Sequence, residues 1–212
     1  IVFYYRKAFQ NIFFFVTFSS ERVYKNFFHL VRLGALLHDI GHGPLSHTTE
    51  FAMPPVAKLN LPDAVVGPDK NRQATHEDYT LKILLDSSLT PVIEKHYAHM
   101  EITPWHVACI VSMDLAETDD FFIDKNVNYR KMLHQIISSE IDADRMDYLK
   151  RDSYYTGVSY GQYELNWLLS NLTYHITSDE TDPRNHAMAH LAVSNRAIYT
   201  FEDFLLSRYH MF

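Results

Sequence analysis

Apolar residues recur at helical spacing along most of the chain, most clearly between residues 23 and 37. Their side chains spread widely around the helix axis, which predicts a helix that is buried on most of its sides. This helix runs into Gly41 and Gly43, which favour a turn, and Pro44 is well placed in the first turn of the next helix. The pattern therefore predicts a buried helix, a glycine-containing turn and a second helix in succession.

Helix start signals mark several later segments. Thr75 with Asp78 resembles a capping box with Asp in place of Glu, and Thr90 and Thr103 are expected N-caps that each precede a proline. Further helices are expected over about residues 127–139, 142–152, 163–170 and from 195 to the end.

Two stretches depart from this helical pattern. Residues 54–72 carry four of the eight prolines and no sustained periodicity, so they are predicted to form a loop or lid. Residues 172–194 alternate between polar and apolar positions on both sides of a polar turn at 178–185, which indicates a small hairpin. The fold class is therefore mainly α, with at most a small β-hairpin near residues 172–194.

The chain has 212 residues, 47% of them hydrophobic, which is enough for one sizeable core. It begins with Ile1 rather than Met and stops within a helical pattern, so we expect a single domain that is truncated at both ends. The aromatic run over residues 12–18 is shorter than the roughly 20 apolar residues that a membrane span needs. We interpret that run as core and expect no membrane segment.

The charge and cysteine content exclude several classes of protein. With 19 Lys and Arg against 26 Asp and Glu the net charge is −7, so nucleic acid is not expected as the main partner. A single cysteine, Cys109, excludes an intramolecular disulfide and a Cys-rich zinc module, and it suits a reducing, cytoplasmic location. A bound metal would therefore be held by histidine and carboxylate, and the chain has 13 histidines.

His38 and Asp39 stand at the end of the predicted buried helix. Neighbouring residues on a helix lie about 100° apart, so this imidazole and carboxylate could converge on one cation. His42 follows His38 by four residues and lies over the same face. Gly41 and Gly43 remove side chains beside the site, which would let a phosphate approach the backbone closely.

His47 and Glu50 are three residues apart on the helix that is predicted next. At this spacing a carboxylate can orient an imidazole and raise its basicity for acid or base catalysis. Taken alone, a buried histidine is more often a hydrogen-bonded core residue than a ligand, and Glu50 would be ordinary surface. Three histidines and an aspartate between residues 38 and 47, beside two glycines, favour a functional site.

A second group of charged residues lies between residues 141 and 152. Asp144 and Asp147 share one helical face, and Tyr148 follows Asp144 by four residues. The alternative is an ordinary charged helix with pairs such as Asp147 and Arg151. Beside the His38–Asp39 motif, Asp144 becomes a candidate third metal ligand.

The two motifs together resemble those of a known family. Leu-Leu-His-Asp-Ile-Gly-His-Gly-Pro-Leu-Ser-His and Ile-Asp-Ala-Asp-Arg-Met-Asp-Tyr, followed by Arg-Asp, resemble the HD-domain phosphohydrolases. Within that family the similarity is closest to the deoxynucleoside triphosphate triphosphohydrolases, which include bacterial dGTPases. It covers about residues 30–50, 73–80, 138–161 and 195–212. The resemblance implies a helical HD-domain fold and hydrolysis of deoxynucleoside triphosphates to deoxynucleoside and tripolyphosphate.

The resemblance also implies roles for individual residues. His38, Asp39 and Asp144 match the metal ligands, for a divalent ion such as Mn, Fe, Mg, Zn or Ni. His47 matches the catalytic acid or base, with Glu50 as its orienting carboxylate. The further catalytic residues are His42 and His76, and the substrate-binding residues are Glu77, Arg145, Tyr148, Asp152 and Arg208. The implied partners are a nucleotide substrate and further copies of the chain in a homo-oligomer.

One ligand of the family has no counterpart in this sequence. The family supplies its first metal histidine from a His-Ser-Leu-Gly type motif upstream of the His-Asp pair. His29 is nine residues before His38, about 900° along a helix, so it faces away and is read as a packing residue. We therefore expect internal segments to be missing from the 212 residues, for example between Phe15 and Glu21.

Two other functions stay open. The chain could be an HD nucleotidase or phosphodiesterase that acts on other phosphoesters, or a nucleotide-sensing module without catalysis. Only a triphosphohydrolase releases tripolyphosphate, so product analysis distinguishes it from a nucleotidase or phosphodiesterase. An intact catalytic site should retain metal, so the metal content of the purified protein tests for a sensing module.

Overall fold

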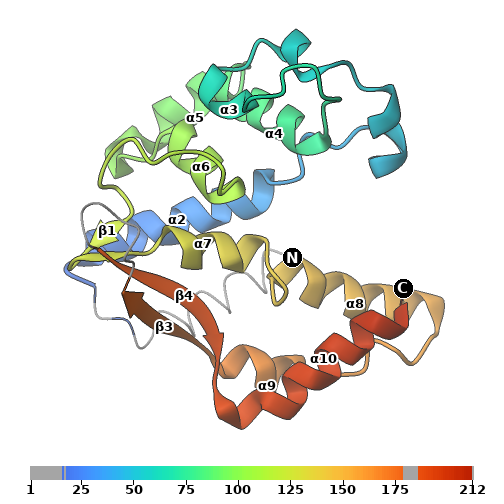
Figure 1. Ribbon diagram of the computed structural model, residues 1–212. Coiled ribbons are helices and arrows are strands. Elements are labelled where there is room, and N and C mark those ends of the chain that lie inside the picture. Colours follow the sequence, from blue (N-terminus) through green and yellow to red (C-terminus); the bar gives the residue numbers. More distant parts are fainter. Residues whose placement is uncertain (1–15, 17, 179–185, 212) are drawn as a thin grey trace. The chain divides into compact units, whose positions relative to one another are not determined.

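The structure, a computed structural model, describes residue 16, residues 18–178 and residues 186–211 (Figure 1). Most of the aromatic run, most of the polar turn of the predicted hairpin and part of the 15–21 junction lie outside the described residues. The chain divides into two compact units. One comprises residues 22–121, and the other comprises the described residues up to Glu21 together with those from Phe122 onward.

The unit of residues 22–121 is built from helices. They are α2 (Glu21–Leu37), η1 (Ser46–Ala52), η2 (Val56–Leu59), α3 (Asp63–Val66), α4 (His76–Leu85), α5 (Thr90–Tyr97), η3 (Ala98–Met100) and α6 (Pro104–Val111). Helix α4 packs against both α5 and α6. The predicted buried helix is confirmed as α2, in which Phe27, Leu30 and Val31 are almost fully buried.

The helix expected to begin at Pro44 was placed too early. It is the 3₁₀ helix η1, and it begins at Ser46. Leu45 has φ 70° and Ser46 has φ 53°, so the backbone passes through the left-handed region where a right-handed helix would have to start. Pro44 therefore belongs to the turn that leads into η1.

The two threonine–proline signals differ in outcome. Thr103 caps α6 as predicted, since its hydroxyl accepts the His106 N–H at 3.2 Å. Thr90 is not the N-cap of α5, because the helix begins at Thr90 itself, after Leu89. The Thr90 hydroxyl is engaged in the preceding turn, where it accepts the Ser87 N–H and donates to the Leu84 carbonyl.

Residues 54–72 are more ordered than the predicted loop. They contain η2 and α3, and Val56, Leu59, Leu61 and Val66 of this segment form a small core together with Ala74, which follows it. Backbone hydrogen bonds close the base of the segment, from Val56 N–H to the Arg72 carbonyl at 3.0 Å and from Ala74 N–H to the Pro54 carbonyl at 3.0 Å. The sequence of this segment shows no sustained helical periodicity, because its two helices are each only four residues long. Its packing could therefore not be predicted from the pattern of apolar residues.

Asp78 fastens this segment to the start of α4. Its buried carboxylate accepts the Thr75 N–H at 2.8 Å and both terminal nitrogens of Arg72 at 2.7 and 2.6 Å. Burial alone would raise the pKa of Asp78, but the hydrogen bonds from Arg72 and Thr75 outweigh it and lower the pKa. The predicted pairing of Thr75 with Asp78 at the helix start is thus confirmed, and Arg72 is an additional partner.

Replacing Asp78 with asparagine is expected to lower the free energy of unfolding by about 1 to 3 kcal/mol at pH 7, because buried charged hydrogen bonds are lost. A lowered carboxyl pKa contributes stability above the unfolded pKa, here near 3.8, and that contribution disappears as the pH falls below it. Urea unfolding at pH 7 and pH 3 measures both effects. Asp63→Asn, which removes only an exposed pair with Lys70, is the control. Equal stabilities of the two variants at pH 7 would contradict the prediction.

The second unit combines helices with a small sheet. Its elements are β1 (Ile123–Asp124), β2 (Val127–Asn128), α7 (Arg130–Ile137), α8 (Ala143–Thr156), α9 (Leu165–Ser170), β3 (Leu172–Ser178), β4 (Ala187–Val193), η4 (Asn195–Ala197) and α10 (Ile198–Met211). Figure 1 shows β3 beside β4, with α7 packed along β4. The predicted hairpin is confirmed, with Leu172 opposite Val193.

The sheet extends beyond that hairpin. Within the described residues four strands pair in the order β1-β2-β4-β3, and β2 runs parallel to β4. The helix expected over 127–139 is therefore shorter than predicted, because Val127 and Asn128 pair with Ala187 and Met188 and leave α7 to begin at Arg130. The mainly helical fold class is confirmed.

The remaining predicted helices match α8, α9 and the run from η4 through α10. The described residues contain no helix that is both long and apolar enough to cross a membrane.

Candidate functional site

His38 and Asp39 lie in the turn directly after α2, with the histidine ring oriented by the backbone. His38 Nδ1 is 3.1 Å from the Ala35 carbonyl oxygen, and its Nε2 is 3.5 Å from Asp39 Oδ2. When Nδ1–H donates to a carbonyl, Nε2 carries the free lone pair, which is the usual arrangement of a metal-binding histidine. The pair therefore offers one nitrogen and one carboxylate to a shared cation.

The turn that carries this pair is fixed to α4 by Thr80. The fully buried Thr80 hydroxyl accepts the Gly41 N–H at 3.0 Å and donates to the His38 carbonyl at 3.0 Å. Gly41 is so close to α4 that a Cβ there would lie 2.0 Å from the His76 carbonyl oxygen. Glycine is required at this position by contact with the backbone of α4, and the turn cannot move independently of His76.

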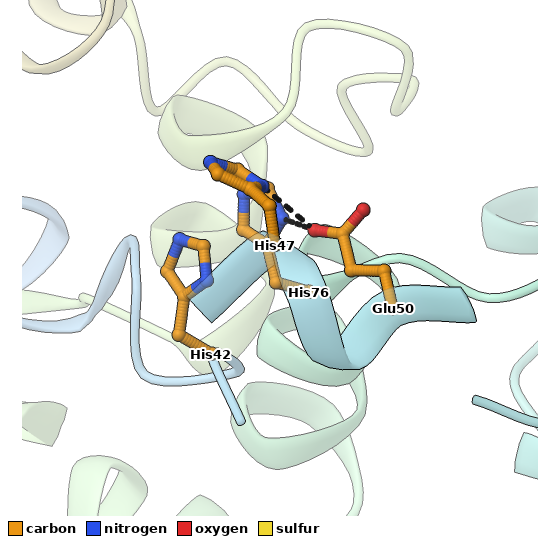
Figure 2. Close-up of side chains that lie close together, drawn as sticks. All are labelled: His42, His47, Glu50 and His76. Carbon is orange, nitrogen blue, oxygen red and sulfur yellow. Dashed lines mark hydrogen bonds and ion pairs between the residues drawn. The ribbon is translucent and has the colours of Figure 1, made fainter. Parts of the chain in front are cut away.

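His42, His47, Glu50 and His76 form a cluster beside that turn, which we call the histidine cluster (Figure 2). Glu50 Oε1 is 3.0 Å from His47 Nδ1 and 2.5 Å from His76 Nδ1, as the dashed lines of Figure 2 show. The contact between His47 and Glu50 expected from their spacing is confirmed. His76 reaches the same oxygen from the first residue of α4.

The electrostatics of the cluster follow from these hydrogen bonds. Hydrogen bonds from His76 and then His47 lower the pKa of Glu50 to about 2, so this carboxylate is ionised at neutral pH. Burial, followed by the neighbouring His76, lowers the pKa of His42. One anionic acceptor thus holds two imidazoles by Nδ1 and leaves their Nε2 atoms available for chemistry.

The histidine cluster could also hold a metal ion, since its four ligand atoms lie within 4.8 Å of one another. The ring geometry favours a different use. The His42 and His76 rings are stacked at 3.9 Å and 7°, so their lone pairs lie in two nearly parallel planes and do not meet at one point. Two Nδ1 atoms are already bonded to Glu50. The His38–Asp39 pair is therefore the better metal position, and the cluster suits proton transfer and phosphate binding.

The two groups are adjacent. Asp39 Oδ1 is 3.8 Å from His42 Nε2, so His42 connects the candidate metal pair to the histidine cluster. Glu77 follows His76 on α4 but is exposed and is not one of the four cluster residues. His29 lies against Tyr97 and lines a pocket with apolar residues such as Leu33, as a packing residue would.

The other predicted residues belong to the second unit, along α8 and near the end of α10. Asp142 caps α8, accepting the N–H groups of Arg145 at 2.7 Å and Ser139 at 2.9 Å. Arg145 Nη1 lies 3.1 Å from Glu140 Oε2, and Arg208 donates to that same oxygen. The structure thus brings together the two predicted phosphate-binding arginines, although they are 63 positions apart in the sequence.

Tyr148 lies among the same charges. Burial raises its pKa, and the surrounding charged groups are Arg208, Arg145, Asp142 and Asp144. Asp152 is half exposed, 3.4 Å from Arg151 Nε.

The ordinary interpretation holds for Asp147, which pairs with Arg151 at 3.1 Å. The metal-ligand role of Asp144 stays a prediction, since Asp144 and the His38–Asp39 pair belong to different units.

Three residues that contribute to the candidate site were not predicted from the sequence. Thr80 gives no sequence signal, because its importance comes from contacts across 39 and 42 positions. Asp142 could have been found as an Asp directly before a helical pattern. For Glu140 the sequence gives no signal other than its position directly before the Ile-Asp-Ala-Asp-Arg motif.

Comparison with known proteins identifies the class. The sequence model of the HD domain matches residues 20–152. The chain therefore belongs to the HD-domain family, whose members are metal-dependent phosphohydrolases in general.

Individual relatives are similar to large parts of the chain. The uncharacterized protein YwfO of Bacillus subtilis is 33% identical over 179 residues, which cover 84% of this chain and 30% of YwfO. A deoxynucleoside triphosphate triphosphohydrolase SAMHD1 homolog of Dictyostelium discoideum is 29% identical over 139 residues, 61% of this chain and 21% of that protein. A crystal structure of a hypothetical protein from Aquifex aeolicus matches with a TM-score of 0.61 and 27% identity, covering 99% of this chain and 43% of the other. The chain spans about a third of the length of the curated relatives YwfO, MG461 homolog and MJ1154.

Proposed function

We propose that the chain is the catalytic domain of a triphosphohydrolase that cleaves deoxynucleoside triphosphates to deoxynucleoside and tripolyphosphate. The observation that carries this proposal is the histidine cluster, in which one ionised glutamate orients two imidazoles beside the His38–Asp39 pair. The named activity of the Dictyostelium relative supports the same choice.

A divalent metal ion fits the residues present. His38 has its Nδ1 on the Ala35 carbonyl and its Nε2 near the Asp39 carboxylate, as a histidine–carboxylate ligand pair requires. His38 and Asp39 would hold the ion, with Asp144 as the third ligand that the resemblance implies. When bound, such an ion supplies charge neutralisation at phosphate and lowers the pKa of water.

The proton chemistry is assigned to His47. Water attacks the α-phosphorus, the bond from phosphorus to the 5′ oxygen breaks, and the leaving oxygen takes a proton from His47. The attacking water gives up one proton to solvent, and His47 is protonated again from solvent before the next turnover. Glu50 holds His47 by Nδ1 and orients the ring, so Nε2–H is the donor. His76 shares the same carboxylate, and His42 lies between the cluster and Asp39.

Substrate binding is assigned to residues of α8 and α10 and to Glu77 of α4. Arg145 and Arg208 would bind the phosphate chain, since guanidinium groups bind phosphate oxygens well. Tyr148 and Asp152 would contact the deoxyribose, as the resemblance implies, and Glu77 is the remaining substrate contact.

The two units are proposed to form one HD domain, because the family match over residues 20–152 crosses the boundary between them. We also propose that the protein is cytoplasmic and self-associates. Sedimentation velocity would detect that association.

The test is incubation of the chain with each of the four dNTPs in the presence of Mn²⁺, Mg²⁺ or Fe²⁺, with products separated by ion-exchange chromatography. Tripolyphosphate and deoxynucleoside in equal amounts are expected, and dialysis against a chelator should abolish their release. Orthophosphate or monophosphate products would instead identify a nucleotidase or phosphodiesterase. Nucleotide binding without turnover would identify a sensing module.

A further inference from the structure

We propose that Glu140 is an internal competitor that occupies the phosphate-binding position between Arg145 and Arg208 and leaves it when a polyphosphate binds. This inference rests on the proposed function, because it takes these two arginines as the phosphate-binding residues. It adds a residue that controls how tightly anions bind there.

The contacts place one carboxylate oxygen where a phosphate oxygen would be expected. Glu140 Oε2 is 3.1 Å from Arg145 Nη1 and also accepts from Arg208 Nη1. Arg145 is in the first turn of α8 and Arg208 in the last turn of α10, two helices that pack together. Two guanidinium groups that share one anionic oxygen form a site of matching charge for phosphate.

Glu140 is able to leave this position. Its side chain is 68% exposed, whereas those of Arg145 and Arg208 are 24% and 32% exposed. Ion pairs of exposed side chains contribute little free energy, so a ligand with several negative charges can displace the carboxylate.

Arg145 would stay in place when Glu140 leaves. Its Nη1 also donates to the Ser139 carbonyl at 2.5 Å, and its Nε is 3.7 Å from the carboxylate of the buried Asp142. The arginine is therefore anchored by partners that do not depend on Glu140. Departure of the carboxylate would free a positioned guanidinium for the incoming phosphate.

The experiment measures binding of inorganic tripolyphosphate to the chain by titration calorimetry, in chelator and at low salt. Glu140→Gln removes the competing charge and is expected to bind tripolyphosphate about two- to fivefold more tightly than the unmodified chain, as loss of an exposed ion pair predicts. Glu164→Gln removes one charge from another exposed position in the same unit and should change affinity little. The difference should shrink at high salt.

Weaker binding by Glu140→Gln would overturn the proposal, because it would mean that Glu140 positions the arginines. Equal binding by the two variants, or no binding by any protein, would overturn it as well. Arg145→Gln and Arg208→Gln test the underlying assignment separately. If neither weakens tripolyphosphate binding, the arginines do not bind phosphate and that part of the proposed function fails. Turnover is not measured in this experiment, so an inactive enzyme would not alter its outcome.

Discussion

Replacing His47 with glutamine is expected to lower dNTP turnover about 10²- to 10⁴-fold, the usual loss when a general acid is removed. The His47 side chain is 71% exposed, so the substitution should leave the fold intact. The proposed metal ligands are other residues, so metal content should be unchanged too. Steady-state tripolyphosphate release, thermal unfolding and metal analysis of the same preparations test these three statements.

His96→Gln is the matched control for this experiment. His96 is another exposed histidine of the same unit, on α5, and has no proposed catalytic role. Its variant should turn over substrate normally. Turnover by His47→Gln at the rate of this control would remove His47 from the mechanism, whatever the metal content.

Gly41→Ala is expected to be the most damaging small substitution in the unit of residues 22–121. The added Cβ would lie 2.0 Å from the His76 carbonyl oxygen, 2.4 Å from the Thr80 nitrogen and 2.8 Å from the Thr80 hydroxyl. The two nearest atoms belong to the backbone of α4, so relief requires the turn and the helix to separate. We expect a loss of about 3 kcal/mol or more in the free energy of unfolding, at the upper end for overpacking.

Gly43→Ala provides a close comparison two residues away. There the three atoms nearest to the new Cβ all belong to the Thr49 side chain, at 3.3 Å, and a small shift of Thr49 relieves the contact. Urea unfolding should show a small change for Gly43→Ala and a large one for Gly41→Ala. Any folded Gly41→Ala should also bind Mn²⁺ more weakly, since His38 and Asp39 are on the displaced turn. Similar midpoints for the two variants would contradict the proposed close approach.

Local signals predicted much of this protein correctly. The helix over residues 23–37, the Thr103 cap, the 172–194 hairpin and the His47–Glu50 contact all depend on residues near one another in the sequence. One error was also local. The helix expected from Pro44 was displaced because Leu45 adopts positive φ without being a glycine, which composition does not reveal.

Contacts between distant segments could not be derived in this way. Glu50 meets His76 across 26 positions, and the parallel pairing of β2 with β4 joins residues 127–128 to 187–188. Neither contact leaves a periodic trace in the sequence. His76 was assigned to the site only because its surroundings resemble a family, and the structure supplies the physical reason, a shared carboxylate oxygen with His47.

The closed base of residues 54–72 has a consequence for how this site can evolve. Hydrogen bonds between Pro54 and Ala74 and between Val56 and Arg72 hold the two ends of the segment together, and Glu50 and His76 lie just outside them. Loop-closure entropy grows slowly with length, so residues inserted between the two hydrogen-bonded ends of the segment would cost little stability. Related chains could therefore vary this segment in length and surface while Glu50 and His76 stay in contact.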